Sequence, residues 1–345
     1  MRARETGRAD GSDRGQAPSY VATPAGRVAL FHQKGPGAPV IYVHGATFPT
    51  ALSIRWGFGR DGTGAPGSPR SAGSAGSAGS WMENLVGWGL DVYGFDFLGY
   101  GTSDRWQNGG GRPLGRVNHA VGALEAVVAA VRAETESTAV SLLAHSWGTL
   151  VAGQFASQWP EQVQRLVLFG PIARRRGEPA ALDPSPTRDI SIRQQWDRFQ
   201  SEVPEGVPPV FPHDAFDPWA AAYLATDSGS GRRSPPAVRV PAGPFCDIAA
   251  AHAGHVFYEP AAIRAPVLVV RGAWDTLAGL ADTAGLVEAL TGAASVDHVV
   301  LSGGTHVMHL ESGRHRLWRI VGSFLTASSP THWVTDAPTG GEESR

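Results

Sequence analysis

Ser146 is the residue of this sequence best placed to act as a nucleophile. It lies between an apolar stretch typical of a buried strand and a segment typical of a helix, in the run Ala144-His145-Ser146-Trp147-Gly148. A tight turn at such a junction lifts a serine hydroxyl above the sheet only if the residues two positions before and after it are small, as Ala144 and Gly148 are. The motif alone also fits an ordinary turn with a buried serine, so the rest of the sequence has to decide.

A serine hydroxyl is a weak nucleophile at neutral pH, and it needs a base within hydrogen-bond reach and a carboxylate that orients this base. Asp275 and His306 fit these roles because each lies just past the end of an expected strand. His309 is only three residues from His306, but the glycines before His306 predict a short turn that presents this side chain toward Ser146. Ser146, Asp275 and His306 are therefore the expected catalytic residues.

Alternating strands and helices are expected to position these residues. Apolar runs predict strands at residues 20–23, 27–32, 39–45, 90–97, 139–143, 163–169, 265–272 and 296–301. Amphipathic segments predict helices that begin at Trp81 and that span residues 118–134, 149–155 and 313–325. This alternation predicts an α/β fold with a mostly parallel central sheet and helices on both faces, in which ligands bind beyond the carboxyl ends of the strands.

Changes in composition divide the chain into segments. Residues 1–18 are polar and expected to be disordered, and residues 327–345 are expected to form a flexible tail. A Gly/Ser/Ala-rich stretch at about residues 60–80 is predicted to be a flexible insertion, natural or engineered, within a core made of residues 19–171 and 265–326. Residues 172–264 are too many for an ordinary connection, and we expect them to form a helical cap, or lid, inserted into that core.

The composition is that of a globular protein: 42% of the 345 residues are hydrophobic, enough for a large core, and the formal net charge is only -2. Such a charge gives no general attraction to phosphates, so no nucleic-acid partner and no membrane partner is expected. The single cysteine, Cys246, argues against disulfides and thiolate metal sites, and we expect no metal and no cofactor. No signal-peptide pattern is evident, which predicts a cytoplasmic location; the oligomeric state stays unknown.

Five motifs at expected strand ends follow one another along the chain. They are His44-Gly45, Asp96-x-x-Gly99-x-Gly101-x-Ser103, the turn at Ser146, Asp275 and Gly304-x-His306. In this order they resemble the motifs of the alpha/beta-hydrolase family, over about residues 20–327. The resemblance implies that Ser146 is the nucleophile, His306 the general base and then acid, and Asp275 the orienting carboxylate. It also implies an oxyanion hole made of the backbone amides of Ala46 and Trp147.

Three details of the sequence bear on which members of this family the chain resembles. The first glycine of the usual nucleophile motif is replaced by Ala144. Serine as the nucleophile argues against haloalkane dehalogenases and epoxide hydrolases, whose relatives carry aspartate there. The Ser-Trp-Gly step is similar to that of proline iminopeptidases. Their His-Gly-Gly-Pro segment, however, is replaced here by His44-Gly45-Ala46-Thr47, which argues against a peptidase.

We therefore expect a serine hydrolase of esterase or thioesterase type that cleaves an ester, thioester or amide through an acyl-enzyme. Its expected partner is a small-molecule apolar acyl substrate, and the residues expected to line the pocket are His44, Thr47, His145, Trp196, Phe199 and Trp219. Two other functions remain open. One is a non-hydrolytic enzyme of the same fold, such as an acyltransferase, a cyclase or a carbon-carbon bond enzyme in natural-product biosynthesis. The other is a ligand-binding protein without catalysis, which would not need all three catalytic residues.

Overall fold

The computed structural model describes residues 17–58, 79–106, 111–175, 177 and 185–327. The expectations for the disordered N-terminus, the Gly/Ser/Ala-rich insertion and the C-terminal tail fall almost wholly outside these residues. Among the residues that the structure describes, no helix has both the length and the apolar composition needed to cross a membrane.

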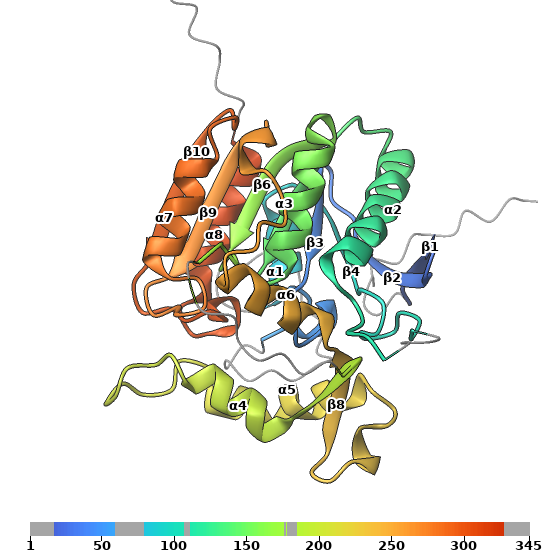
Figure 1. Cartoon of the computed structure of the whole chain (residues 1–345), viewed down its shortest axis with the longest axis vertical. Coiled ribbons are helices and arrows are strands. Elements are labelled where there is room, and N and C mark those ends of the chain that lie inside the picture. Colours follow the sequence, from blue (N-terminus) through green and yellow to red (C-terminus); the bar gives the residue numbers. More distant parts are fainter. Residues whose placement is uncertain (1–16, 59–78, 107–110, 176, 178–184, 328–345) are drawn as a thin grey trace, which may run out of the picture.

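An eight-stranded sheet forms the centre of the molecule (Figure 1). Its strands are, in spatial order, β1 (Ser19–Thr23), β2 (Gly26–Gln33), β4 (Asp91–Phe95), β3 (Pro39–Val43), β5 (Val140–His145), β6 (Val163–Phe169), β9 (Val267–Gly272) and β10 (Val296–Leu301). β2 runs antiparallel to β1 and to β4, and all the other neighbours are parallel. Strands β3, β5 and β9 are buried along their whole length, as strands covered on both faces must be.

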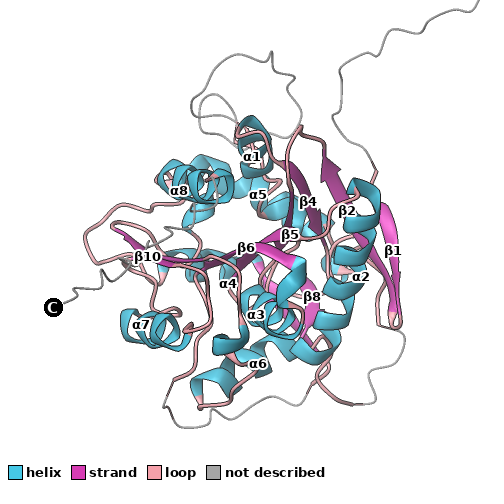
Figure 2. Cartoon of the chain, turned by 90° about the horizontal axis from the view of Figure 1, so that it is seen from above, coloured by secondary structure: helices cyan, strands magenta, loops and turns pink. Residues whose placement is uncertain are grey.

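Helices cover both faces of this sheet (Figure 2). One face carries α1 (Trp81–Gly87) and α8 (Arg314–Thr326), and the other carries α2 (Val117–Thr135), α3 (Gly148–Gln158) and α7 (Leu280–Ala289). The apolar positions of α2 that repeat with helical spacing are all buried, namely Val121, Leu124, Val127, Val128 and Val131. The expected α/β architecture is therefore confirmed, although α7 was not among the predicted helices.

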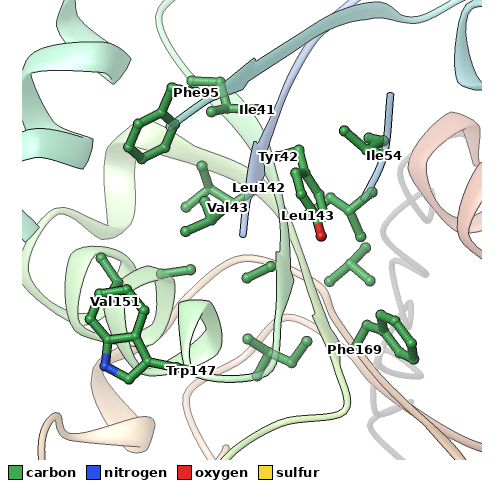
Figure 3. Close-up of a cluster of buried hydrophobic side chains, with 14 of the residues drawn as sticks. Ile41, Tyr42, Val43, Ile54, Phe95, Leu142, Leu143, Trp147, Val151 and Phe169 are labelled. Atoms are coloured by element: carbon green, nitrogen blue, oxygen red, sulfur yellow. The ribbon is translucent and has the colours of Figure 1, made fainter. Parts of the chain in front are cut away.

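Side chains from the central strands alternate between the two layers of the core (Figure 3). Val43 points to the side on which Trp147 and Val151 lie, whereas Tyr42 points to the side of Ile54 and Phe169. This alternation follows from the period of two along a strand. It anchors the strand ends that carry the residues discussed below in a well-packed interior.

The segment between β6 and β9, called the cap from here on, lies beyond one end of the sheet (Figure 1). It contains β7 (Thr187–Ser191), α4 (Ile192–Gln200), α5 (His213–Ala225), β8 (Ala237–Pro241) and α6 (Gly243–His252). β7 and β8 pair as a separate antiparallel sheet, which the sequence analysis did not predict. The cap thus covers the end of the sheet where the parallel strands end.

Candidate active site

Ser146 occupies a strained turn between β5 and α3. Its φ angle is +57°, in the left-handed region that residues other than glycine rarely adopt. A Cβ atom at Gly148 would lie 2.5 Å from the carbonyl oxygens of both Val43 and His44, so this position of the turn requires glycine. The Ser146 carbonyl accepts a hydrogen bond from the Thr149 hydroxyl at 2.6 Å, which helps to hold the turn.

The structure brings Ser146, His306 and Asp275 together in one chain of hydrogen bonds. Ser146 Oγ lies 2.7 Å from His306 Nε2, and His306 Nδ1 lies 3.0 Å from Asp275 Oδ2. A carboxylate can only accept a hydrogen bond, so the proton of a neutral His306 ring belongs on Nδ1, and Nε2 is free to accept the proton of the serine hydroxyl. The arrangement can therefore turn the Ser146 hydroxyl into a nucleophile.

Asp275 is held as a charged carboxylate. It lies in the loop after β9 and is 1% exposed, and burial alone would raise its pKa. The attraction of His306 and hydrogen bonds, including one at 2.7 Å from the Ala278 amide, outweigh the burial and lower the pKa of Asp275. A charged Asp275 can stabilise the imidazolium that forms when His306 takes a proton.

Two other histidines lie beside His306 but have structural partners. The His145 ring stacks on Phe169, and its Nε2 donates to the His306 carbonyl at 2.9 Å. His309 Nε2 lies 3.0 Å from Ser53 Oγ, below the site. Burial lowers the pKa of His309 to about 3 and the pKa of His145 well below its ordinary value, so both rings stay neutral. Of the described histidines, His306 is the one that reaches Ser146.

His44 fixes the loop that carries Ala46. The Phe97 amide donates to His44 Nε2 at 3.0 Å, so Nδ1 keeps the proton and donates to the Gly45 carbonyl at 2.7 Å. The C=O and N–H groups of a trans peptide point in opposite directions, so the Ala46 amide faces away from this ring. The Ala46 carbonyl accepts from the Tyr100 hydroxyl at 2.6 Å. Both peptide groups that flank Ala46 are thus fixed, as a preorganised oxyanion donor requires.

Trp147, the second expected oxyanion residue, is anchored by the cap. Its indole Nε1 donates to Asp247 Oδ2 at 3.0 Å, and Asp247 lies on α6. The same carboxylate accepts the Val117 amide at the start of α2 and pairs with Arg116. Burial raises the pKa of Asp247, and the charge of Arg116 opposes this rise. Asp247 therefore ties the residue after Ser146 to the cap and to α2, a role that the sequence analysis missed.

Glu202, which follows α4 in the cap, connects the loops of Asp275 and His306. One carboxylate oxygen accepts the Thr276 amide at 2.7 Å and the Thr276 hydroxyl at 2.8 Å. The other oxygen accepts the His306 amide at 2.7 Å. Glu202 was not among the expected site residues, because a carboxylate that binds backbone amides leaves no motif in the sequence. The cap thus helps to set the position of the expected base.

The expected pocket residues occupy four different environments. His44 and His145 have the partners given above. Phe199 and Trp219 are fully buried in the cap, where their rings contact Phe211 and Phe216, and both also contact Phe48 of the core. Trp196 is partly buried, with its ring 4.7 Å from that of Phe216. Thr47 follows the expected oxyanion residue and accepts a hydrogen bond from Arg198 of α4 at 2.5 Å.

Comparisons with known proteins agree with this architecture. A profile of the family described as serine aminopeptidase, S33, matches residues 69–190, about a third of the chain. A search of curated proteins found no match. Among similar solved structures, an esterase from Exiguobacterium antarcticum is 16% identical with a TM-score of 0.57 and covers 90% of this chain and 100% of its own.

Two further similar structures belong to enzymes whose names describe other reactions. A 2-hydroxy-6-oxo-6-phenylhexa-2,4-dienoate hydrolase from Rhodococcus is 18% identical with a TM-score of 0.60, over 90% of this chain and 99% of that one. An epoxide hydrolase from Vigna radiata is 16% identical with a TM-score of 0.55, over 89% of this chain and 97% of that one. At these identities the likeness concerns the fold, which these enzymes share with this chain.

Proposed function

We propose that this chain, which has the alpha/beta-hydrolase fold, is a serine hydrolase that cleaves an ester, thioester or amide of a small molecule through an acyl-enzyme on Ser146. The observation that carries the proposal is the chain of hydrogen bonds from Ser146 through His306 to Asp275. A merely structural serine would not need a strained φ angle, a base at 2.7 Å and a buried carboxylate behind that base.

The proposed reaction has two halves. In the first, Ser146 Oγ bonds to the substrate carbonyl carbon while His306 Nε2 takes the hydroxyl proton, and His306 then returns the proton to the departing alcohol, thiol or amine. In the second, a water molecule attacks the acyl carbon while His306 takes its proton; the bond between this carbon and Ser146 Oγ then breaks, His306 returns the proton to Oγ, and the carboxylic acid leaves. The amides of Ala46 and Trp147 would stabilise the oxyanion in both halves, and one such donor contributes roughly 3 kcal/mol.

One observation bears on the class of substrate. The positive charge of Arg198 lies next to the expected oxyanion loop, where it would repel the protonated α-amino group of an aminopeptidase substrate. We therefore favour ester or thioester cleavage over the activity in the description of the matched family.

Acyl transfer to another nucleophile is the second candidate. Ser146 is only 1% exposed and His306 only 4%, so the cap limits which molecules reach the acyl-enzyme. Water and a small alcohol would compete for the same acyl group. Product analysis of 4-nitrophenyl butyrate hydrolysis with added methanol distinguishes the two, because a transferase forms methyl butyrate as its main product.

Intact-protein mass spectrometry after treatment with a fluorophosphonate tests the proposal. We expect one adduct on the native chain and none on Ser146→Ala, whose turnover of 4-nitrophenyl butyrate falls at least 1,000-fold. A native-like thermal melt of the variant is the control. An unmodified native chain that is folded, or a variant that keeps normal turnover, would contradict the proposal.

A further inference from the structure

Arg198 presents an unused positive charge at the candidate site. It lies on α4 of the cap, is partly buried, and donates one of its five N–H groups to the Thr47 hydroxyl. Within the described part of the chain, no carboxylate lies within ion-pair distance of the guanidinium, and Thr47 supplies its side-chain hydrogen bond. The other N–H groups are therefore available to a ligand.

The two carboxylates that attract Arg198 are already engaged. Glu202 accepts the hydrogen bonds from Thr276 and His306 described above, and Asp275 accepts those from His306 and Ala278. The charge of Arg198 also helps to lower the pKa of His145 and of His309. Its field thus extends toward the histidines around the expected base.

Two uncharged polar side chains beside Arg198 also lack well-placed partners. Gln195 lies on the same face of α4, three residues before Arg198, and is fully buried, yet neither atom of its amide has a partner with good hydrogen-bond geometry among the described residues. The Tyr223 hydroxyl on α5 is equally buried and likewise lacks a partner with good geometry. Burial raises the pKa of Tyr223, and hydrogen bonding to the nearby Gln195 amide and the charge of Arg198 oppose that rise, so the three side chains form one cluster. Groups that are incompletely satisfied in this way cost free energy, which a bound polar group would recover.

We propose that Arg198, with Gln195 and Tyr223, binds a carboxylate group of the substrate, so that this protein acts on esters or thioesters that carry a free carboxylate near the scissile bond. A carboxylate accepts two parallel hydrogen bonds from a guanidinium, and the amide and phenol supply further donors. Thr47 directly follows Ala46, so the bound carboxylate would lie close to the expected oxyanion hole. This inference rests on the proposed serine hydrolase function and adds a polar end to its otherwise apolar substrate.

Matched pairs of esters test this preference. The first series compares 4-nitrophenyl hemisuccinate and hemiglutarate with their neutral primary amides, which places the carboxylate on the acyl side. The second compares 3-acetoxybenzoate with 3-acetoxybenzamide, which places it on the alcohol side. In at least one series we expect kcat/KM for the anionic ester to exceed that for its amide roughly 10- to 100-fold, the range for a hydrogen bond to a charged group.

Variants assign that preference to Arg198. In Arg198→Met the ratio of the two kcat/KM values is expected to fall to about one, and in Arg198→Lys, which keeps the charge without the planar fork, to lie between. Arg193→Met is the matched control, because Arg193 lies on the same helix with its side chain 83% exposed. It should leave the ratio unchanged. Labelling of each variant with the neutral fluorophosphonate checks that Ser146 is still reactive.

Three outcomes would overturn the inference: a native ratio near one in both series, a ratio that survives in Arg198→Met, or equal losses on both esters of a pair. In the first case water molecules alone would fill the cluster, and in the last Arg198 would only hold the cap in place. Each of these outcomes can be told apart from a failure of the proposed serine hydrolase function. If Ser146 is labelled and neutral esters are cleaved, the function stands and only the carboxylate site is wrong.

Discussion

The two halves of the candidate site are built in different ways. The core half carries Ser146, Asp275 and His306 on loops at the ends of three parallel strands, where the sheet fixes their spacing. The cap half carries Glu202 and Asp247, which bind the loops and the indole of the core half from outside. The core half therefore carries the proposed reacting groups, and the cap half fixes the loops that bear them.

A change in the core half is expected to have the largest effect on activity. Asp275→Asn keeps the shape of the side chain but removes the charge that orients His306, so kcat for 4-nitrophenyl butyrate should fall roughly ten-thousand-fold. Steady-state kinetics on a sample with a native-like melt measures this. A loss below tenfold would mean that Asp275 does not orient the base, and the core half would need another carboxylate.

A change in the cap half should be smaller but still catalytic. Glu202→Gln weakens the bonds to Thr276 and His306 without emptying the site, and we expect kcat to fall roughly 10- to 100-fold through misplacement of the base, with little change in KM. The rate of fluorophosphonate labelling should fall in proportion. Glu205→Gln is the control, because Glu205 lies in the same loop and is exposed. If both variants behave alike, the cap half only covers the site.

The buried histidine His309 makes the stability of the folded protein depend on pH. His309 has a folded pKa of about 3 against an ordinary value of 6.5, so below pH 6.5 the unfolded state takes up a proton that the folded state does not. The free energy of unfolding should therefore fall with decreasing pH by about 1.4 kcal/mol per pH unit from this residue, until its folded pKa is reached.

Asp96 and Glu311 act in the opposite sense, because burial raises the pKa of Asp96 to about 6 and that of Glu311 to about 7. For this reason the measured quantity is the difference in the free energy of unfolding between the native chain and a variant that lacks His309. Chemical denaturation of the native chain and of His309→Gln at pH 7 and pH 5.5 should give stability differences that shrink as pH falls. Parallel pH dependences would show that His309 titrates in the folded protein as it does in the unfolded one.

The core half could be predicted from the sequence, and the cap half could not. Ser146 lies in a motif that requires small neighbours, and the choice of His306 over His309 relied on the preceding glycines; Gly303 indeed adopts a φ of +71°. Such constraints act within a few residues, so they are visible in a sequence. The fold itself was confirmed for the same reason, because strand and helix periodicities are local.

Glu202 and Asp247 have no comparable signal. Glu202 binds the amide of His306, which lies 104 residues away, and any residue except proline at that position would offer the same amide. Asp247 binds an indole 100 residues earlier in the chain. Phe199 and Trp219, which were expected to line the pocket, contact each other in the cap and also Phe48, which follows β3 in the core. A count of aromatic residues does not reveal such contacts, because it does not show which face of an insertion packs on the core.

The bonds from Glu202 also bear on how freely caps can be exchanged between relatives. A chimaera that combines this core with a foreign cap would inherit the sheet, the strained serine and the histidine, yet its Asp275 and His306 loops would lack the carboxylate that joins them. Cap and core are thus not independent modules. A transplanted cap would need an acidic side chain at the end of its first helix before it could change specificity without loss of rate.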